Sequence, residues 1–146
     1  MNTYMKHLLH HRILATVLVA MAVMASFCSC DRKSAKEQLQ EAMVQTQKQL
    51  PKLLDEDITW MKASYDRSAN EILFEYSSRK NHALSEDERR LVHEMMVGQV
   101  FPAFENDGER MVGLIRKLRP KVRYIYRWEG DDHVWLDDTC RADEYL

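Results

Sequence analysis

The stretch Lys121-Val-Arg-Tyr-Ile-Tyr-Arg-Trp128, followed by Glu-Gly-Asp-Asp and His133-Val-Trp-Leu-Asp137, decides the fold class. Apolar or aromatic residues occupy every even position from 122 to 128, and Lys or Arg occupies three of the four odd positions before them. Alternation of this kind predicts a β-strand with one buried and one exposed face. A short polar turn then leads into a second strand, so we predict an antiparallel hairpin here.

This hairpin also carries a candidate binding face. Arg123 and Arg127 share the exposed side of the first strand, and Trp135 alternates onto the polar side of the second. We expect Arg123, Arg127 and Trp135 on one face, where two cations beside an indole are suited to an anionic glycan or a protein partner. The alternative is cross-strand pairing of the two arginines with Asp132 or Asp137, which leaves a solvated face without a ligand.

Two helical segments precede the hairpin. Apolar side chains recur at every third or fourth position in residues 91–104 and again in residues 111–118. Ser85 and Glu88 match a capping box, in which each side chain accepts a hydrogen bond from the other residue's backbone. We therefore predict that the first of these helices begins at Ser85.

An earlier hairpin and an earlier helix complete the pattern. Residues 58–65 and 71–77 contain several β-branched and aromatic residues and are separated by a five-residue polar turn, which predicts two paired strands. An apolar stripe from Leu39 to Leu50 predicts a helix before them. Pro51 ends it, because the residue before a proline avoids helical angles.

The predicted order is α-β-β-α-α-β-β in a single small α+β domain. We expect the two hairpins to share one antiparallel sheet that helices cover on one face. The chain has 146 residues, of which 45% are hydrophobic and 30% charged. This composition is too apolar for a disordered chain, and the length is too short for several domains.

The N-terminal residues differ from the rest. Lys6 and Arg12 precede the uncharged apolar run from Ile13 to Phe27. A basic segment followed by an apolar segment of this length is typical of a secretory signal peptide. The run from Ile13 to Cys30 would form a helix of about 27 Å, which is slightly short for a membrane span.

The end of this run, Phe27-Cys28-Ser29-Cys30, resembles the lipobox of bacterial lipoproteins. In that family a cysteine after small residues becomes the lipidated N-terminus, which here implies lipid attachment at Cys30. Cys28 is the poorer candidate, because Phe27 would then stand at the cleavage site, where the family has a small side chain. Phe27 itself departs from the leucine that is usual at the apolar position of the motif.

The resemblance implies a signal peptide over 1–29, a lipidated cysteine and tether over 30–36, and a globular domain over 37–146. It places the protein in a Gram-negative cell envelope, anchored to a membrane by lipid and facing the periplasm or the cell surface. The alternatives are cleavage without lipidation and an uncleaved anchor. Asp31 does not decide between the inner and outer membranes.

The mature chain shows no catalytic or metal-binding signature. His82, His93 and His133 lie far apart without paired-ligand spacing, so neither a metal nor a cofactor is expected. Cys140 is the thiol that remains after lipidation of Cys30, and its acidic neighbours argue against a reactive nucleophile. Its role is left open. Without the leader, the chain has 19 Lys and Arg against 23 Asp and Glu. The net charge is therefore negative, which disfavours a nucleic acid partner.

These patterns favour an envelope lipoprotein that acts as a non-catalytic binding or accessory module. The alternative is a periplasmic hydrolase or an inhibitor of an envelope enzyme. A concave pocket with converging polar groups would indicate an enzyme. A flat surface or an exposed strand edge would indicate a binding module.

Overall fold

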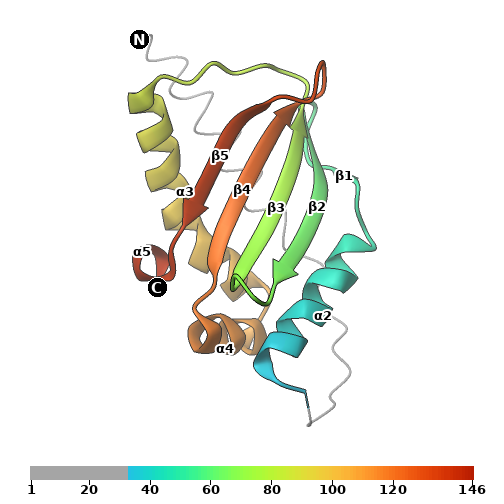
Figure 1. Ribbon diagram of the computed structural model, residues 1–146, viewed down its shortest axis with the longest axis vertical. Coiled ribbons are helices and arrows are strands. Elements are labelled where there is room, and N and C mark those ends of the chain that lie inside the picture. The colour runs from blue at the N-terminus through green and yellow to red at the C-terminus, as the bar shows by residue number, and fades with distance from the viewer. Residues whose placement is uncertain (1–32) are drawn as a thin grey trace.

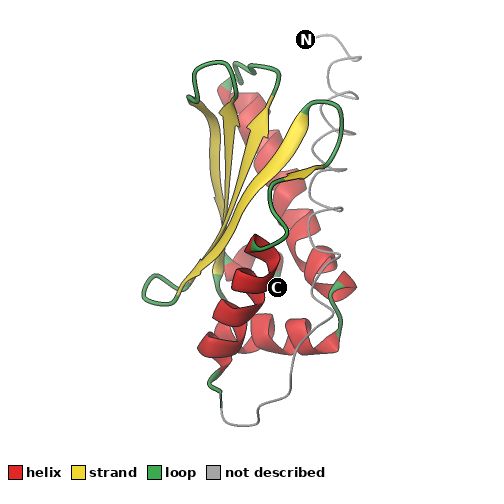
Figure 2. Ribbon diagram, turned by 90° about the vertical axis from the view of Figure 1, so that its right-hand side faces the viewer, coloured by secondary structure: helices red, strands yellow, loops and turns green. Residues whose placement is uncertain are grey.

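The computed structural model describes residues 33–146, and the predicted signal peptide, with Cys28 and Cys30, lies outside the described residues. The described chain is α+β, as predicted: a five-stranded sheet with its helices gathered on one side (Figures 1 and 2). Within residues 33–146, no helix combines the length and apolar character that crossing a membrane requires.

The elements follow the predicted order with two additions. In chain order they are α2 (Ala35–Gln47), β1 (Lys52–Leu53), β2 (Ile58–Asp66), β3 (Glu71–Ser78), α3 (Glu86–Asn106), α4 (Glu109–Leu118), β4 (Lys121–Trp128), β5 (Val134–Cys140) and α5 (Ala142–Tyr145). The additions are β1 and α5, which are too short to produce a periodic sequence pattern.

The sheet is mixed, and the prediction of a purely antiparallel sheet is wrong. The strand order is β1-β2-β3-β4-β5, with both predicted hairpins present, but β3 and β4 pair in parallel from Glu71 opposite Lys121 to Ser78 opposite Trp128. The cause is the helical connection. The 21 residues of α3 span about 31 Å, which returns the chain to the end where β3 began, so β4 runs in the same direction.

Two capping boxes fix where the main helices begin. Ser85 and Glu88 form the predicted box at the start of α3, with backbone-to-side-chain distances of 2.8 and 3.3 Å. Ser34 and Glu37 form a second box at α2. This helix therefore begins two residues before the predicted domain boundary at residue 37.

The core lies between the sheet and the helices and is rich in aromatic side chains. The ring of Tyr76 stacks between those of Tyr126 and Trp60. Its centroid lies 4.7 Å from that of Tyr126 and 6.3 Å from that of Trp60. Val92, Met96 and other apolar side chains of α3 pack against this layer. Only one face of the sheet is covered in this way, which leaves the second face to solvent in the described part of the chain (Figure 2).

Candidate functional site

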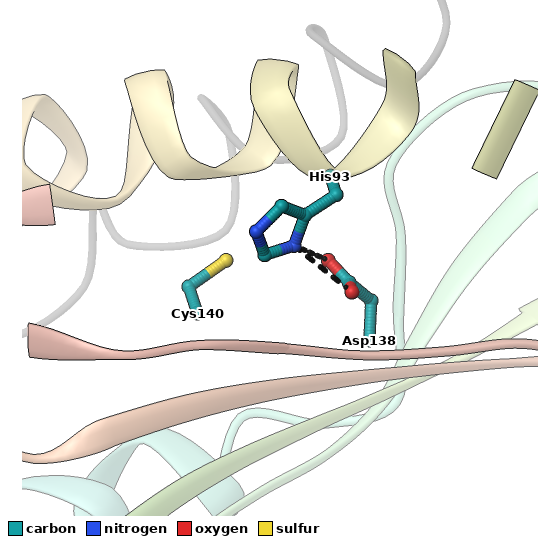
Figure 3. Close-up of side chains that lie close together, drawn as sticks. All are labelled: His93, Asp138 and Cys140. Atoms are coloured by element: carbon teal, nitrogen blue, oxygen red, sulfur yellow. Dashed lines mark hydrogen bonds and ion pairs between the residues drawn. The ribbon is translucent and has the colours of Figure 1, made fainter. Parts of the chain in front are cut away.

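Three side chains of different chemistry meet where α3 crosses β5 (Figure 3). They are His93 from α3 and Asp138 and Cys140 from β5, and their ligand atoms all lie within 4.8 Å of one another. The His93 Nδ1 atom is 3.0 and 2.9 Å from the two carboxylate oxygens of Asp138. On the other side of the ring, Nε2 is 3.3 Å from Oε1 of Glu144 in α5.

The local sequence explains this convergence. Asp138 and Cys140 are two residues apart on a strand, so both side chains point to the same face. They stand opposite Tyr124 and Val122 of β4, which face the helices. Cys140 is fully buried, whereas the His93 and Asp138 side chains are 29% and 20% exposed.

The electrostatics favour a charged imidazole and a neutral thiol. Burial lowers the pKa of His93, but hydrogen bonds and ionic attraction from Asp138 and Glu144 outweigh it, so the pKa is raised overall. Burial, with a smaller contribution from the charges of Asp138 and Glu144, raises the pKa of Cys140 to about 12. The expectation of an unreactive Cys140 thus has a structural basis, with burial as the larger cause.

This geometry does not suit nucleophilic catalysis. A thiol nucleophile must be ionised and open to a substrate, whereas the Cys140 thiol is buried and its pKa is raised to about 12. The arrangement suits two other tasks. It joins α3, β5 and α5 through an ion-pair network, and it offers nitrogen, oxygen and sulfur donors to a metal ion.

The sequence analysis did not predict this cluster, because 45 residues separate His93 from Asp138. The signal that was available is the spacing of Asp138 and Cys140, which places both on one face of a strand.

The second candidate surface is the uncovered face of the sheet. Arg123 and Arg127 both lie there, as predicted, but each is surrounded by acceptors. Arg123 contacts Asp137 at 2.6 Å and Glu71 at 3.9 Å. Arg127 lies 3.8 Å from the carboxylate of Glu75 and donates a 3.4 Å hydrogen bond to the backbone carbonyl oxygen of Asp132.

Trp135 does not share this face, and its predicted placement is wrong. The register shifts between Tyr126 and Arg127, so that Arg127 stands opposite Val134 while Tyr126 stands opposite Leu136. Trp135 is the extra residue of this β-bulge and has no partner in the register with β4. It is only 4% exposed, and its ring packs 5.2 Å from that of Tyr126 in the core. Val134 takes the exposed position instead.

A groove of about 590 Å³ lies where α2 meets the outer edge of β2. Beyond Trp60, β2 has no pairing with β1, and the side chain of Gln47 accepts a 2.9 Å hydrogen bond from the backbone of Ala63 there. Met43 and Met61 contribute apolar surface to the groove. Its lining includes no histidine or cysteine, so it is separate from the cluster around His93.

Comparison with known proteins identifies a fold and no activity. No family model matches the chain, and no curated protein matches it. A solved structure from Pseudomonas aeruginosa, described as a candidate secreted protein, is similar with a TM-score of 0.58 and 15% sequence identity. The match covers 82% of this chain and 100% of that one. The likeness shows a shared fold.

Proposed function

We propose that this protein is a lipoprotein of a Gram-negative envelope, anchored through Cys30 and acting as a non-catalytic binding or accessory module. The leader and its lipobox-like residues support the anchor. The fold shared with a candidate secreted protein supports export.

The observation that carries the proposal is the position of α2. Its N-cap is Ser34, only four residues after Cys30. Four extended residues span at most about 14 Å. A lipid on Cys30 would therefore hold the folded domain against the membrane surface, where it meets partners that are themselves in or on that membrane.

The uncovered sheet face is the surface that we assign to the partner. Its exposed cations, Lys121, Arg123 and Arg127, alternate with Glu71, Glu75 and Asp137 within 4 Å. A polyanionic glycan needs unpaired positive charge, whereas a protein surface can present both signs in a complementary pattern. The face therefore favours an envelope protein over an anionic glycan as the partner.

The alternative class, a periplasmic hydrolase or an enzyme inhibitor, has weaker support. The groove beside α2 is open and of mixed polarity, and the thiol of Cys140 is buried. Neither combines a pocket with an activated side-chain nucleophile, which is the arrangement of hydrolases that form a covalent intermediate.

Lipid labelling in the native host tests the anchor. Cells that express the wild type, Cys30→Ser and Cys28→Ser are grown with a radiolabelled fatty acid and fractionated. We expect label and membrane association to disappear in Cys30→Ser and to persist in Cys28→Ser, the matched control. Equal labelling of the wild type and Cys30→Ser would overturn the lipoprotein assignment.

Cross-linking in the same cells tests the binding role. A membrane-permeant cross-linker followed by mass spectrometry should recover a defined envelope protein with the wild type and lose it with Cys30→Ser. Recovery that is the same for both variants would show that anchoring does not serve partner binding. Conversion of an envelope polymer by the purified protein would favour the hydrolase.

A further inference from the structure

We propose that His93, Asp138 and Cys140 bind a divalent transition metal ion of the zinc type, with Glu144 orienting the imidazole. The proposal is independent of the lipid anchor and of the sheet face. It rests on a donor set that the fold assembles from two distant segments, α3 and β5 (Figure 3).

The spacing of the donors suits tetrahedral zinc. Two ligands at Zn–N and Zn–O distances of about 2.0 Å and a tetrahedral angle lie about 3.3 Å apart. The Nδ1 atom of His93 is already 2.9 Å from Oδ2 of Asp138. One ligand atom each from His93, Asp138 and Cys140 lies within 4.8 Å of the other two, and a nitrogen–sulfur pair on zinc lies about 3.6 Å apart. Small side-chain rotations therefore bring all three donors onto one ion.

The chemistry of the donors selects the metal class. Magnesium and calcium prefer oxygen ligands alone, whereas zinc accepts thiolate, imidazole and carboxylate together. Zinc would displace the proton of the Cys140 thiol, because the thiolate is the species that coordinates. Three protein ligands leave one coordination position for water. His93 and Asp138 are partly exposed, so an ion reaches the site between α3 and β5.

The outer contacts of the cluster are also those of a metal site. A histidine that coordinates through one nitrogen commonly donates its other N–H to a carboxylate, which fixes the tautomer and the ring orientation. Glu144 lies 3.3 Å from Nε2 of His93. Its second carboxylate oxygen accepts a 2.7 Å hydrogen bond from the backbone of Arg141, so Glu144 is itself held in place at the start of α5.

Cobalt is the probe for the experiment, because a thiolate-bound Co²⁺ gives a charge-transfer band in the near ultraviolet that zinc abolishes on displacing it. The full chain is purified in detergent with Cys28→Ser and Cys30→Ser, so that Cys140 is the sole thiol. Titration with Co²⁺ should give the band, and Zn²⁺ should remove it stoichiometrically.

Single variants in this background assign the ligands. His93→Gln and Asp138→Asn should weaken Co²⁺ binding at least tenfold, and Cys140→Ser should remove the charge-transfer band. Glu144→Gln should weaken binding by about 10–100-fold, as loss of an outer-shell partner does. Circular dichroism confirms that each variant is folded, and His93→Gln, which keeps the buried thiol, remains informative if Cys140→Ser does not fold.

His133→Gln is the matched control. His133 also pairs with a carboxylate, that of Asp131 at 2.6 Å. This pair is not part of the candidate metal-ligand cluster that the described residues form, which consists of His93, Asp138 and Cys140. Its substitution should leave Co²⁺ binding unchanged. Absence of the band in the parent protein, or its persistence in Cys140→Ser, would overturn the proposal and leave the cluster as an ion-pair network alone.

Discussion

Arg123 and Asp137 form a bidentate ion pair across β4 and β5, with Nε donating to Oδ1 at 2.8 Å and Nη2 donating to Oδ2 at 2.6 Å. The pair is diagonal, because Asp137 stands opposite Ile125 and Arg123 stands opposite Thr139. Its hydrogen bonds hold the pKa of Asp137 below its usual value. The charge that makes this face attractive as a binding surface is thus already compensated within the sheet.

The double change Arg123→Gln, Arg127→Gln separates binding from stability. Both side chains are partly exposed, and ion pairs of this kind contribute about 0–1 kcal/mol, so the free energy of unfolding should change by no more than that. Recovery of the cross-linked envelope partner should fall, and recovery by the wild type should decrease with added salt.

Arg89→Gln, Arg90→Gln on the exposed part of α3 is the control, because it removes the same charge from a different surface. It should leave recovery unchanged. If recovery by the sheet variant also equals that of the wild type, with the fold intact, the ion pairs are solely structural and the partner binds elsewhere.

Two buried tyrosines give opposite predictions for removal of the hydroxyl group. The Tyr76 hydroxyl is buried without a hydrogen-bond partner among the described residues, whereas the Tyr145 hydroxyl donates to the Pro120 carbonyl oxygen at 2.6 Å. Leaving a buried polar group unpaired costs about 1–3 kcal/mol. Tyr76→Phe should therefore raise the free energy of unfolding, and Tyr145→Phe should lower it by about 1–2 kcal/mol.

Urea unfolding followed by tryptophan fluorescence measures both changes under the same conditions. The two variants delete the same atom, so their difference isolates the hydrogen bond from the loss of volume. A decrease for Tyr76→Phe as large as that for Tyr145→Phe would show that water or another group satisfies the Tyr76 hydroxyl.

The elements of the fold were predictable where the pattern is local. The strands at 58–66 and 71–78, the capping box at Ser85 and the alternating strand at 121–128 all follow from residue types within one segment. The direction of β4 relative to β3 was not predictable in this way. It depends on the path of the connection through α3 and α4, and no local pattern encodes that path.

The candidate sites show the same division. Arg123 and Arg127 were placed correctly because strict alternation fixes their side of the strand. Trp135 was misplaced because a single extra residue at the bulge shifts the register and reverses the alternation. His93, Asp138 and Cys140 were not associated at all, because their proximity depends on how α3 packs against β5.

The apolar stripe of α4 predicts a large cost of truncation. Ile115 is fully buried in the core cluster, and the adjacent Leu114 is 7% exposed. Ile115→Ala and Leu114→Ala should each lower the free energy of unfolding by about 2–5 kcal/mol, with Ile115 at the upper end, because a cavity remains in each case. Val44→Ala in α2 is the control, since Val44 is 45% exposed, and its effect should stay within about 0.5 kcal/mol. Denaturant unfolding checks all three, and a loss below that limit for Ile115 would contradict the packing of α4.

Asp107 provides a prediction for the pH dependence of stability. It lies at the C-terminal end of α3, where the partial charge of the helix is negative. Its Oδ2 atom is buried, and no residue within 33–146 donates a hydrogen bond to it. Burial raises the pKa of Asp107 from 3.8 to about 7. The folded state therefore holds a proton that the unfolded chain releases near pH 4.

The sign follows from proton linkage. Because the folded protein binds this proton more tightly, the contribution of Asp107 to stability is present in acid and is lost as the pH rises from 3.8 to about 7. Asp107→Asn removes the titrating group, so it should raise the free energy of unfolding at pH 8, by about 1–3 kcal/mol, and change it little at pH 3.5. Urea unfolding at both pH values measures the difference, with the exposed Glu105→Gln as the control. A gain for Asp107→Asn that is the same at both pH values would show that the carboxyl group titrates normally.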